Sequence, residues 1–137
     1  MKYLNRLAII ALALSTFSLY SCKDDDESKI EPAVEFHFSS PESGAMFGKG
    51  DTVFMTGMLH WEEELHGFEI TLTNITKDSV VYTAHAHEDT KMMNISQMWI
   101  NNVTEHSDMK LTIDALTDHD GAEQTKEIDF HCHPMKM

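Results

Sequence analysis

The chain alternates apolar and polar residues with a period of two over most of its length. Seven such runs lie at residues 34–38, 53–61, 68–74, 80–87, 95–100, 109–115 and 128–132. This period is typical of β-strands that bury one face, and no segment keeps a helical period over three turns. Asp120-Gly121, between the last two runs, is a strong hairpin signal. The pattern therefore predicts an all-β protein.

Seven short strands within about 100 residues predict an antiparallel two-sheet sandwich, with a β-barrel as the alternative. Two turn motifs add a resemblance to this prediction. The first is Pro-x-x-Gly followed by Gly-Asp-x-Val, formed by Pro41, Gly44, Gly50, Asp51 and Val53. The second is Ala-x-x-Asp-x-Asp-Gly at residues 115–121. Both resemble motifs of bacterial immunoglobulin-like (Ig-like) domains, which implies an Ig-like sandwich over residues 33–137.

The first residues have the pattern of a secretory signal. Lys2 and Arg6 precede an apolar run at residues 7–20 that is too short to span a bilayer comfortably. The tetrapeptide Leu-Tyr-Ser-Cys that ends at Cys22 resembles a bacterial lipoprotein signal, with a small residue directly before the cysteine and an aliphatic residue three before it. The resemblance implies that residues 1–21 are a lipoprotein signal peptide and that Cys22 is acylated. The lipid bilayer is then one partner of the protein.

Residues 22–32 are charged and aperiodic, so they predict a short disordered tether behind the acylated cysteine. The acidic stretch at residues 23–27 resembles the tract by which Bacteroidota send lipoproteins to the cell surface. With the turn motifs, the whole chain resembles small Ig-like lipoproteins of Bacteroidota. That resemblance implies a lipid-anchored, surface-exposed protein of the outer membrane, and it implies no activity.

The charge of the chain excludes one class of partner. Without Lys2 and Arg6, the remaining chain carries 8 basic and 23 acidic residues, a net charge of −15 with neutral histidine. Such a surface repels nucleic acid and attracts cations.

Histidine is the compositional outlier among the possible metal ligands. Once Cys22 carries lipid, Cys132 is the single thiol, which excludes an intrachain disulfide and a cysteine-based zinc site. The nine histidines include two His-x-His pairs, at residues 85–87 and 131–133. In a strand, residues i and i+2 face the same side about 7 Å apart, so each pair presents two imidazoles to a metal ion. An exposed pair of this kind can also be no more than a solvated polar face.

Ig-like connectivity sorts the histidines into two groups, because alternate connections lie at opposite poles of the sandwich. The predicted ligands at the first pole are His66, His85, His87 and His119, with His60 and Asp118 in reserve. A second, weaker cluster is predicted at the opposite pole from His37, His106, His131 and His133. Two imidazoles on one strand and further ligands from a neighbouring loop make a site suited to Zn²⁺ or Cu²⁺.

Other residue types change this picture little. Met92-Met93 follows the first pair closely and would suit Cu(I), although core packing is the commoner use of methionine. Trp61 and Trp99 could stack on sugars, but core packing is the expected role in a sandwich. The chain has no Gly-x-Ser-x-Gly elbow, phosphate-binding loop or His-Glu-x-x-His motif, so we do not expect an enzyme.

These observations predict a lipid-anchored cell-envelope protein that binds zinc or copper through histidines at one pole. Capture, buffering or delivery to an outer-membrane transporter or another envelope protein would all fit such a site. The alternative is an adhesion or accessory module that binds a protein or glycan partner through its loops, without metal.

Overall fold

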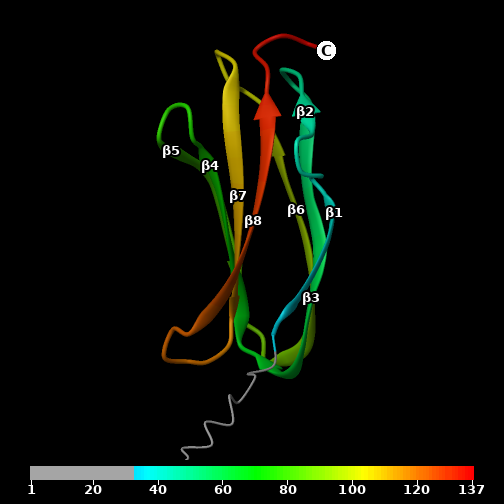
Figure 1. The fold of residues 1–137 in the computed structure, drawn as a ribbon, viewed down its shortest axis with the longest axis vertical. Coiled ribbons are helices and arrows are strands. Elements are labelled where there is room, and N and C mark those ends of the chain that lie inside the picture. The colour runs from blue at the N-terminus through cyan, green and yellow to red at the C-terminus, as the bar shows by residue number, and fades with distance from the viewer. Residues whose placement is uncertain (1–32) are drawn as a thin grey trace, which may run out of the picture. The chain divides into compact units, whose positions relative to one another are not determined.

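The computed structural model describes residues 33–137, which form eight β-strands and no helix (Figure 1). The strands are β1 (Glu35–Ser40), β2 (Met46–Phe47), β3 (Thr52–Leu65), β4 (Gly67–Asn74), β5 (Ser79–Ala86), β6 (Thr90–Ile100), β7 (Ser107–Leu116) and β8 (Glu123–Cys132). This part of the chain therefore offers no helix that could cross a membrane. The predicted signal peptide, the acylated Cys22 and the tether lie outside the described residues.

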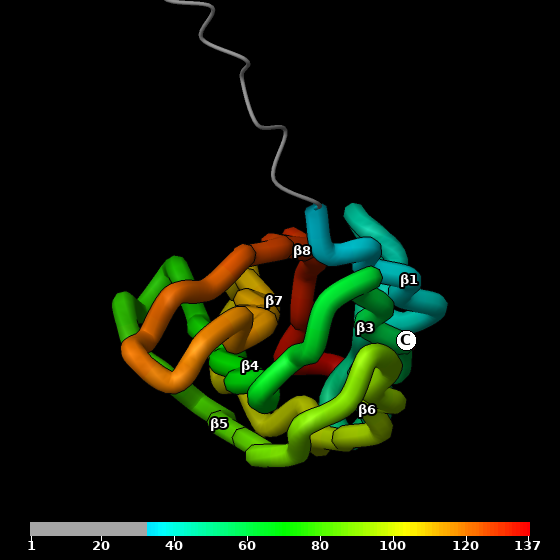
Figure 2. Tube along the Cα trace, turned by 90° about the horizontal axis from the view of Figure 1, so that it is seen from below, coloured from blue at the N-terminus to red at the C-terminus, as the bar shows by residue number. Residues whose placement is uncertain are grey.

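The strands form two sheets packed as two layers, seen along the strands in Figure 2. One sheet has the order β1-β3-β6 and the other the order β2-β8-β7-β4-β5. Neighbouring strands are antiparallel except β2 and β8, which are parallel. A three-stranded sheet therefore packs against a five-stranded sheet in which β5 is the edge strand next to β4. This is an Ig-like arrangement. The prediction of an all-β, two-sheet Ig-like sandwich is confirmed.

The structure corrects the predicted strands in four places. β6 begins at Thr90 instead of residue 95, and β8 begins at Glu123 instead of residue 128. The other two corrections concern β2 and β3. β2 is an eighth strand in a region that the sequence predicted as a turn, and it pairs with His131 and Cys132 of β8. Its two residues are too few to produce an alternating pattern. β3 continues beyond the predicted end at residue 61 to Leu65, which is fully buried. Three exposed glutamates at residues 62–64 concealed this last part of the strand.

The apolar faces of the two sheets meet in one hydrophobic core. Trp61 and Trp99 belong to it, each only 8% exposed, so packing rather than a sugar platform is their role. The ring of Phe130, near the end of β8, meets that of Phe47 edge-on at 5.5 Å between centroids. The buried members of this core all lie within residues 34–132. A fragment comprising residues 23–137 therefore contains every core residue of the described part of the chain and is suitable for solution experiments.

A buried asparagine joins three segments at one end of the sandwich. Asn101 is 1% exposed and its Nδ2 donates to the carbonyl oxygens of Phe47 and His133, each at 3.1 Å. Its Oδ1 accepts a hydrogen bond from the backbone N–H of Val103 at 3.1 Å. The side chain thus ties the β6–β7 connection to the end of β2 and to the segment after β8.

The thiol of Cys132 points into the core, as the alternation predicts, and is fully buried. Burial raises the pKa of this thiol to about 11, so the reactive thiolate is scarce at neutral pH. In the fragment 23–137, where Cys132 is the only thiol, we expect iodoacetamide to react at least ~100-fold more slowly with native than with denatured protein. Mass spectrometry over time measures both rates, and equal rates would contradict the buried placement.

Candidate functional site

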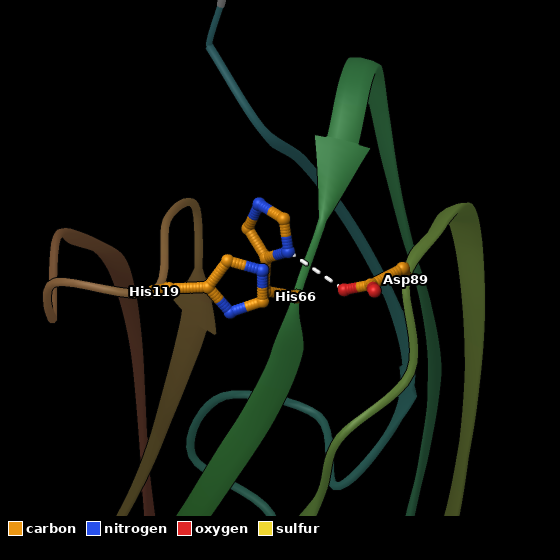
Figure 3. A group of neighbouring side chains, drawn as sticks. All are labelled: His66, Asp89 and His119. Carbon is orange, nitrogen blue, oxygen red and sulfur yellow. Dashed lines mark hydrogen bonds and ion pairs between the residues drawn. The ribbon is translucent and has the colours of Figure 1, made fainter.

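Three connections bring His66, Asp89 and His119 together at one end of the sandwich (Figure 3). His66 forms the β3–β4 corner, Asp89 lies between β5 and β6, and His119 lies in the β7–β8 turn. Nδ1 of His66 is 2.7 Å from Oδ1 of Asp89, and the ring centroids of His66 and His119 are 4.0 Å apart. Each residue offers one ligand atom, and the three atoms lie within 4.8 Å of one another. We call this group the first-pole site.

Backbone contacts fix the corner that carries His66. The N–H of His66 donates to the carbonyl oxygen of Leu116 at 2.9 Å, which joins the corner to the end of β7. Gly67 follows with a φ of +152°, and a Cβ at this position would clash with the carbonyl oxygen of Ala86. Only glycine lets the start of β4 approach the end of β5 so closely. This close approach brings the β5–β6 connection, with Asp89, next to His66.

Asp118, a predicted reserve ligand, instead organises the β7–β8 turn. Its Oδ1 accepts the backbone N–H of Ala122 at 2.8 Å and that of Asp120 at 2.9 Å. These hydrogen bonds, the one from Ala122 foremost, lower the pKa of the Asp118 carboxyl. The carboxylate is committed to the turn that presents the neighbouring His119.

The first-pole site has the dimensions that a metal ion requires. Ligands at 2.0–2.1 Å from one Zn²⁺ lie roughly 3.4 Å apart in a tetrahedron, so small side-chain rotations would close the observed group around an ion. The His66 side chain is 20% exposed and that of Asp89 is 56% exposed, which leaves the group accessible. A pocket of about 420 Å³ opens here, lined by His66, His87, Glu88, Asp89 and His119. His87 and Glu88 are therefore further donors in the same pocket, outside the group of three converging ligand atoms.

The His-x-His pair of β5 brings only one of its rings to this pocket. His85 and His87 are both exposed, as the alternation predicts, with ring centroids 5.8 Å apart. His87 lines the pocket, whereas His85 lies within β5 opposite Glu69 and is not among the lining residues. Asp89 was missing from the predicted ligands, although it follows His87 by two residues in the same connection. Its proximity to the second histidine of the pair was the available signal.

His60 and His37 lie on neighbouring strands, and the structure corrects their predicted placement at opposite poles. Because β3 continues to Leu65, His60 lies inside the strand, away from the pole at which it was predicted. Both rings contact Glu35 of β1, with Nε2 of His37 at 3.2 Å and Nδ1 of His60 at 3.3 Å from its Oε2. Hydrogen bonds from His37 first and His60 second lower the pKa of Glu35. Neither His37 nor His60 belongs to either group of converging ligand atoms among the described residues.

A second group forms at the opposite end of the β7–β8 ladder, which pairs Ser107 with Cys132 here and Leu116 with Glu123 at the first pole. Its members are His106, Asp108 and His131, whose ligand atoms also lie within 4.8 Å of one another. We call this group the second-pole site. His133 contacts it, with its Nδ1 3.0 Å from Nδ1 of His106. The structure brings together His106, His131 and His133 of the predicted second cluster. It excludes His37 and adds Asp108.

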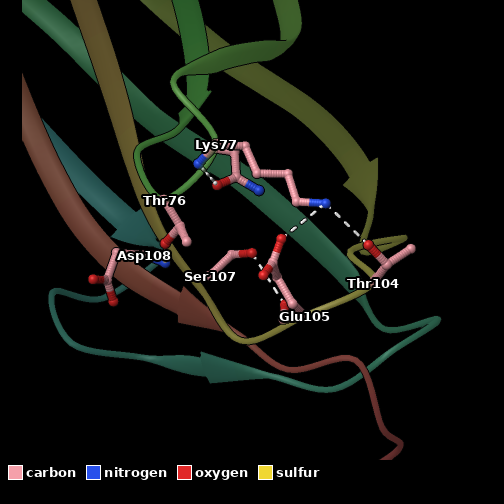
Figure 4. A network of polar contacts seen from close by, with 7 residues as sticks. Thr76, Lys77, Thr104, Glu105, Ser107 and Asp108 are labelled. Atoms are coloured by element: carbon pink, nitrogen blue, oxygen red, sulfur yellow. Dashed lines mark hydrogen bonds and ion pairs between the residues drawn. The ribbon is translucent and has the colours of Figure 1, made fainter.

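A polar network beside the second-pole site fixes the β6–β7 connection to the β4–β5 turn (Figure 4). Nζ of Lys77 donates to Oγ1 of Thr104 and pairs with Oε1 of Glu105, both at 3.0 Å. The backbone N–H of Asp108 donates to Oγ1 of Thr76 at 2.9 Å. The β4–β5 turn thereby holds the segment at residues 104–105 and at residue 108, before and after His106.

Neither a family model nor a curated protein matches this chain. Among solved structures, it resembles catalytic inactive OgpA from Akkermansia muciniphila in complex with an O-glycopeptide (glycodrosocin) substrate, with a TM-score of 0.50 and 14% identity. Wild-type OgpA gives a TM-score of 0.51 and 14% identity. The matches cover 75% of this chain and only 29% and 28% of those chains, so this chain spans less than a third of their length.

The chain also resembles the CARDB domain of the PF1109 protein from Pyrococcus furiosus, which was crystallised in complex with di-metal ions. That match has a TM-score of 0.42 and 7% identity, and covers 74% of this chain and 90% of that one. At their identity the OgpA matches support the fold alone, and the CARDB match is weaker still.

Proposed function

We propose that this chain is a lipid-anchored protein of the outer cell envelope that binds a divalent transition-metal ion, zinc or copper, at the first-pole site. The convergence of His66, Asp89 and His119 from three separate connections, with ligand atoms within 4.8 Å of one another, carries the proposal. The resemblance of residues 19–22 to a lipoprotein signal supports acylation of Cys22. In this proposal the protein binds its ion without catalysis, and holds it for an outer-membrane transporter or another envelope protein.

The donor atoms favour Zn²⁺ or Cu²⁺ over Cu(I). Imidazole nitrogen with carboxylate oxygen suits divalent ions, whereas Cu(I) prefers thiolate and thioether sulfur. Met93 is buried in the core at 4% exposure, and Met92 is paired with His60 across β3 and β6. Neither methionine lines the first-pole pocket, so the proposal for this site does not use the Cu(I) interpretation of Met92-Met93.

Negative charge supports cation binding in two ways, through the net charge of the chain and through Asp89. The net charge of the chain is −13 with neutral histidine, which raises the local concentration of cations. Asp89 accepts the hydrogen bond at Nδ1 of His66 when that nitrogen carries its proton, which fixes the tautomer whose Nε2 can bind metal. The carboxylate thus serves the site either as a ligand or as the group that orients His66.

Calorimetric titration of the fragment 23–137 with Zn²⁺ and with Cu²⁺ tests this function. We expect His66→Ala/His119→Ala to weaken one binding event by at least ~100-fold, because it removes two of the three ligands that converge at the site. His37→Ala/His60→Ala is the matched control, since it removes two other exposed histidines and should leave that event unchanged.

Undiminished binding in the His66→Ala/His119→Ala variant would rule out the first-pole site. Absence of binding to either ion in the unaltered fragment would favour the adhesion or accessory module, with a protein or glycan partner and solvated histidines.

A further inference from the structure

We infer that the opposite pole holds a second, separate metal site, in which His106, Asp108 and His131 bind a divalent transition-metal ion and His133 positions His106. Nδ1 of His131 lies 2.8 Å from Oδ1 of Asp108, and the rings of His106 and His131 are stacked with centroids 6.1 Å apart. One ligand atom from each of the three residues lies within 4.8 Å of the others. Two imidazoles and a carboxylate form a donor set for Zn²⁺ or Cu²⁺.

The backbone around this site is fixed before any ion arrives. The N–H of His131 donates to the carbonyl oxygen of Ala45 at 2.9 Å, and the N–H of His133 donates to that of Phe47 at 2.8 Å. These hydrogen bonds hold the end of β8 against the β2 segment. The Lys77 network holds the facing connection, so two separately anchored segments present the ligands. A group held in this way loses little entropy when it binds an ion.

His133 contributes an unusual observation to this site. Its Nε2 is buried and has no hydrogen-bond partner, while its Nδ1 is within hydrogen-bond distance of His106. A buried ring nitrogen without a partner costs free energy, so the ring is held here by its other contacts. The contact between the two Nδ1 atoms leaves Nε2 of His106 available as a ligand. A histidine that binds metal commonly uses its other nitrogen in a hydrogen bond that orients the ring, and His133 is the group placed to receive it.

The two sites are too far apart to share one ion or one metal cluster. They lie at the two ends of β7, whose 10 residues span roughly 30 Å at the rise of an antiparallel strand. The inference therefore predicts two independent ions in each chain. Neither site depends on the other, so each can fail alone.

Native mass spectrometry of the fragment 23–137 with Zn²⁺ counts the bound ions. We expect two in the unaltered fragment, one in His106→Ala/His131→Ala, one in His66→Ala/His119→Ala and none when all four residues are replaced. His37→Ala/His60→Ala should retain two. Asp108→Asn preserves the shape of the side chain and should weaken the second event at least ~10-fold, which separates ligand loss from misfolding.

The outcomes distinguish the two proposals. A single ion in the unaltered fragment that survives in His106→Ala/His131→Ala would overturn the second-pole site and leave the first intact. A single ion lost in that variant and retained in His66→Ala/His119→Ala would support the second-pole site and overturn the proposed function. No bound ion in the unaltered fragment would overturn both.

The role of His133 has its own readout. In the His66→Ala/His119→Ala background, Cu²⁺ bound at the second pole should show nitrogen hyperfine coupling in electron paramagnetic resonance from the two ligand imidazoles. His133→Ala should lower the affinity about 10-fold and keep that nitrogen pattern, as expected for a positioning residue. Loss of a nitrogen in the spectrum would make His133 a ligand, and an unchanged affinity would contradict the positioning role.

Discussion

Replacing Asn101 with alanine is expected to lower the free energy of unfolding by about 3 kcal/mol, because it leaves buried backbone groups without partners. The carbonyl oxygen of His133 and the N–H of Val103 each lose the hydrogen bond that the Asn101 side chain provides. The carbonyl oxygen of Phe47 keeps its bond from the N–H of His133. For a domain of this size the loss corresponds to a melting temperature lower by roughly 10 °C. Denaturant and thermal unfolding of the fragment 23–137 measure the change.

Asn102→Ala is the matched control, because it removes the same side chain from the adjacent position, which is exposed. We expect it to change the free energy of unfolding by less than about 0.5 kcal/mol. Equal effects of the two substitutions would show that the buried hydrogen bonds of Asn101 contribute nothing specific to stability.

The fold could be predicted from the sequence wherever one face of a strand is buried. β7 shows why, since its odd-numbered residues from Ser107 to Ala115 are buried and the residues between them are more exposed. The corrections at β2 and β3 arose where this physical basis is missing. β2 is too short to alternate, and it exists because its backbone pairs with β8. The end of β3 has a run of glutamates before Leu65, so its buried face shows at only one position.

The sequence could predict which residues share a pole of the sandwich, because the order of the strands determines which connections lie at the same end. His66 and His119 lie in connections at the same end of the sandwich, so the order of strands is enough to place them together. His60 was misplaced because the end of β3 was misplaced. Its contact with Glu35 depends on the register between β1 and β3, which pairs these two residues. Alternation within one strand fixes the face on which a residue lies but not its partner on the next strand. The same limit explains the omission of Asp108, which is paired with His131 across β7 and β8.

Gly67→Ala is expected to damage the fold and the first-pole site together. The added Cβ would clash with the carbonyl oxygen of Ala86 and lie 3.3 Å from its carbonyl carbon and from Cα of His87, so the backbone must move. Overpacking of this kind costs about 1–3 kcal/mol, and a φ of +152° adds strain for any residue with a Cβ. Ala86 ends β5 and leads into the connection that carries Asp89. Its displacement separates Asp89 from His66.

We therefore expect Gly67→Ala to lower the free energy of unfolding by about 3 kcal/mol and the affinity of the first-pole site for Zn²⁺ by roughly 10-fold. Gly44→Ala is the matched control, since Gly44 also has a positive φ, +77°, but a Cβ there has nothing within 4 Å. It should cost about 1 kcal/mol from backbone strain alone and leave Zn²⁺ binding unchanged. Chemical unfolding and calorimetric titration of both variants separate the two effects. A Gly67→Ala variant that loses stability but binds Zn²⁺ normally would show that the close approach of β4 to β5 supports the fold without positioning the metal ligands.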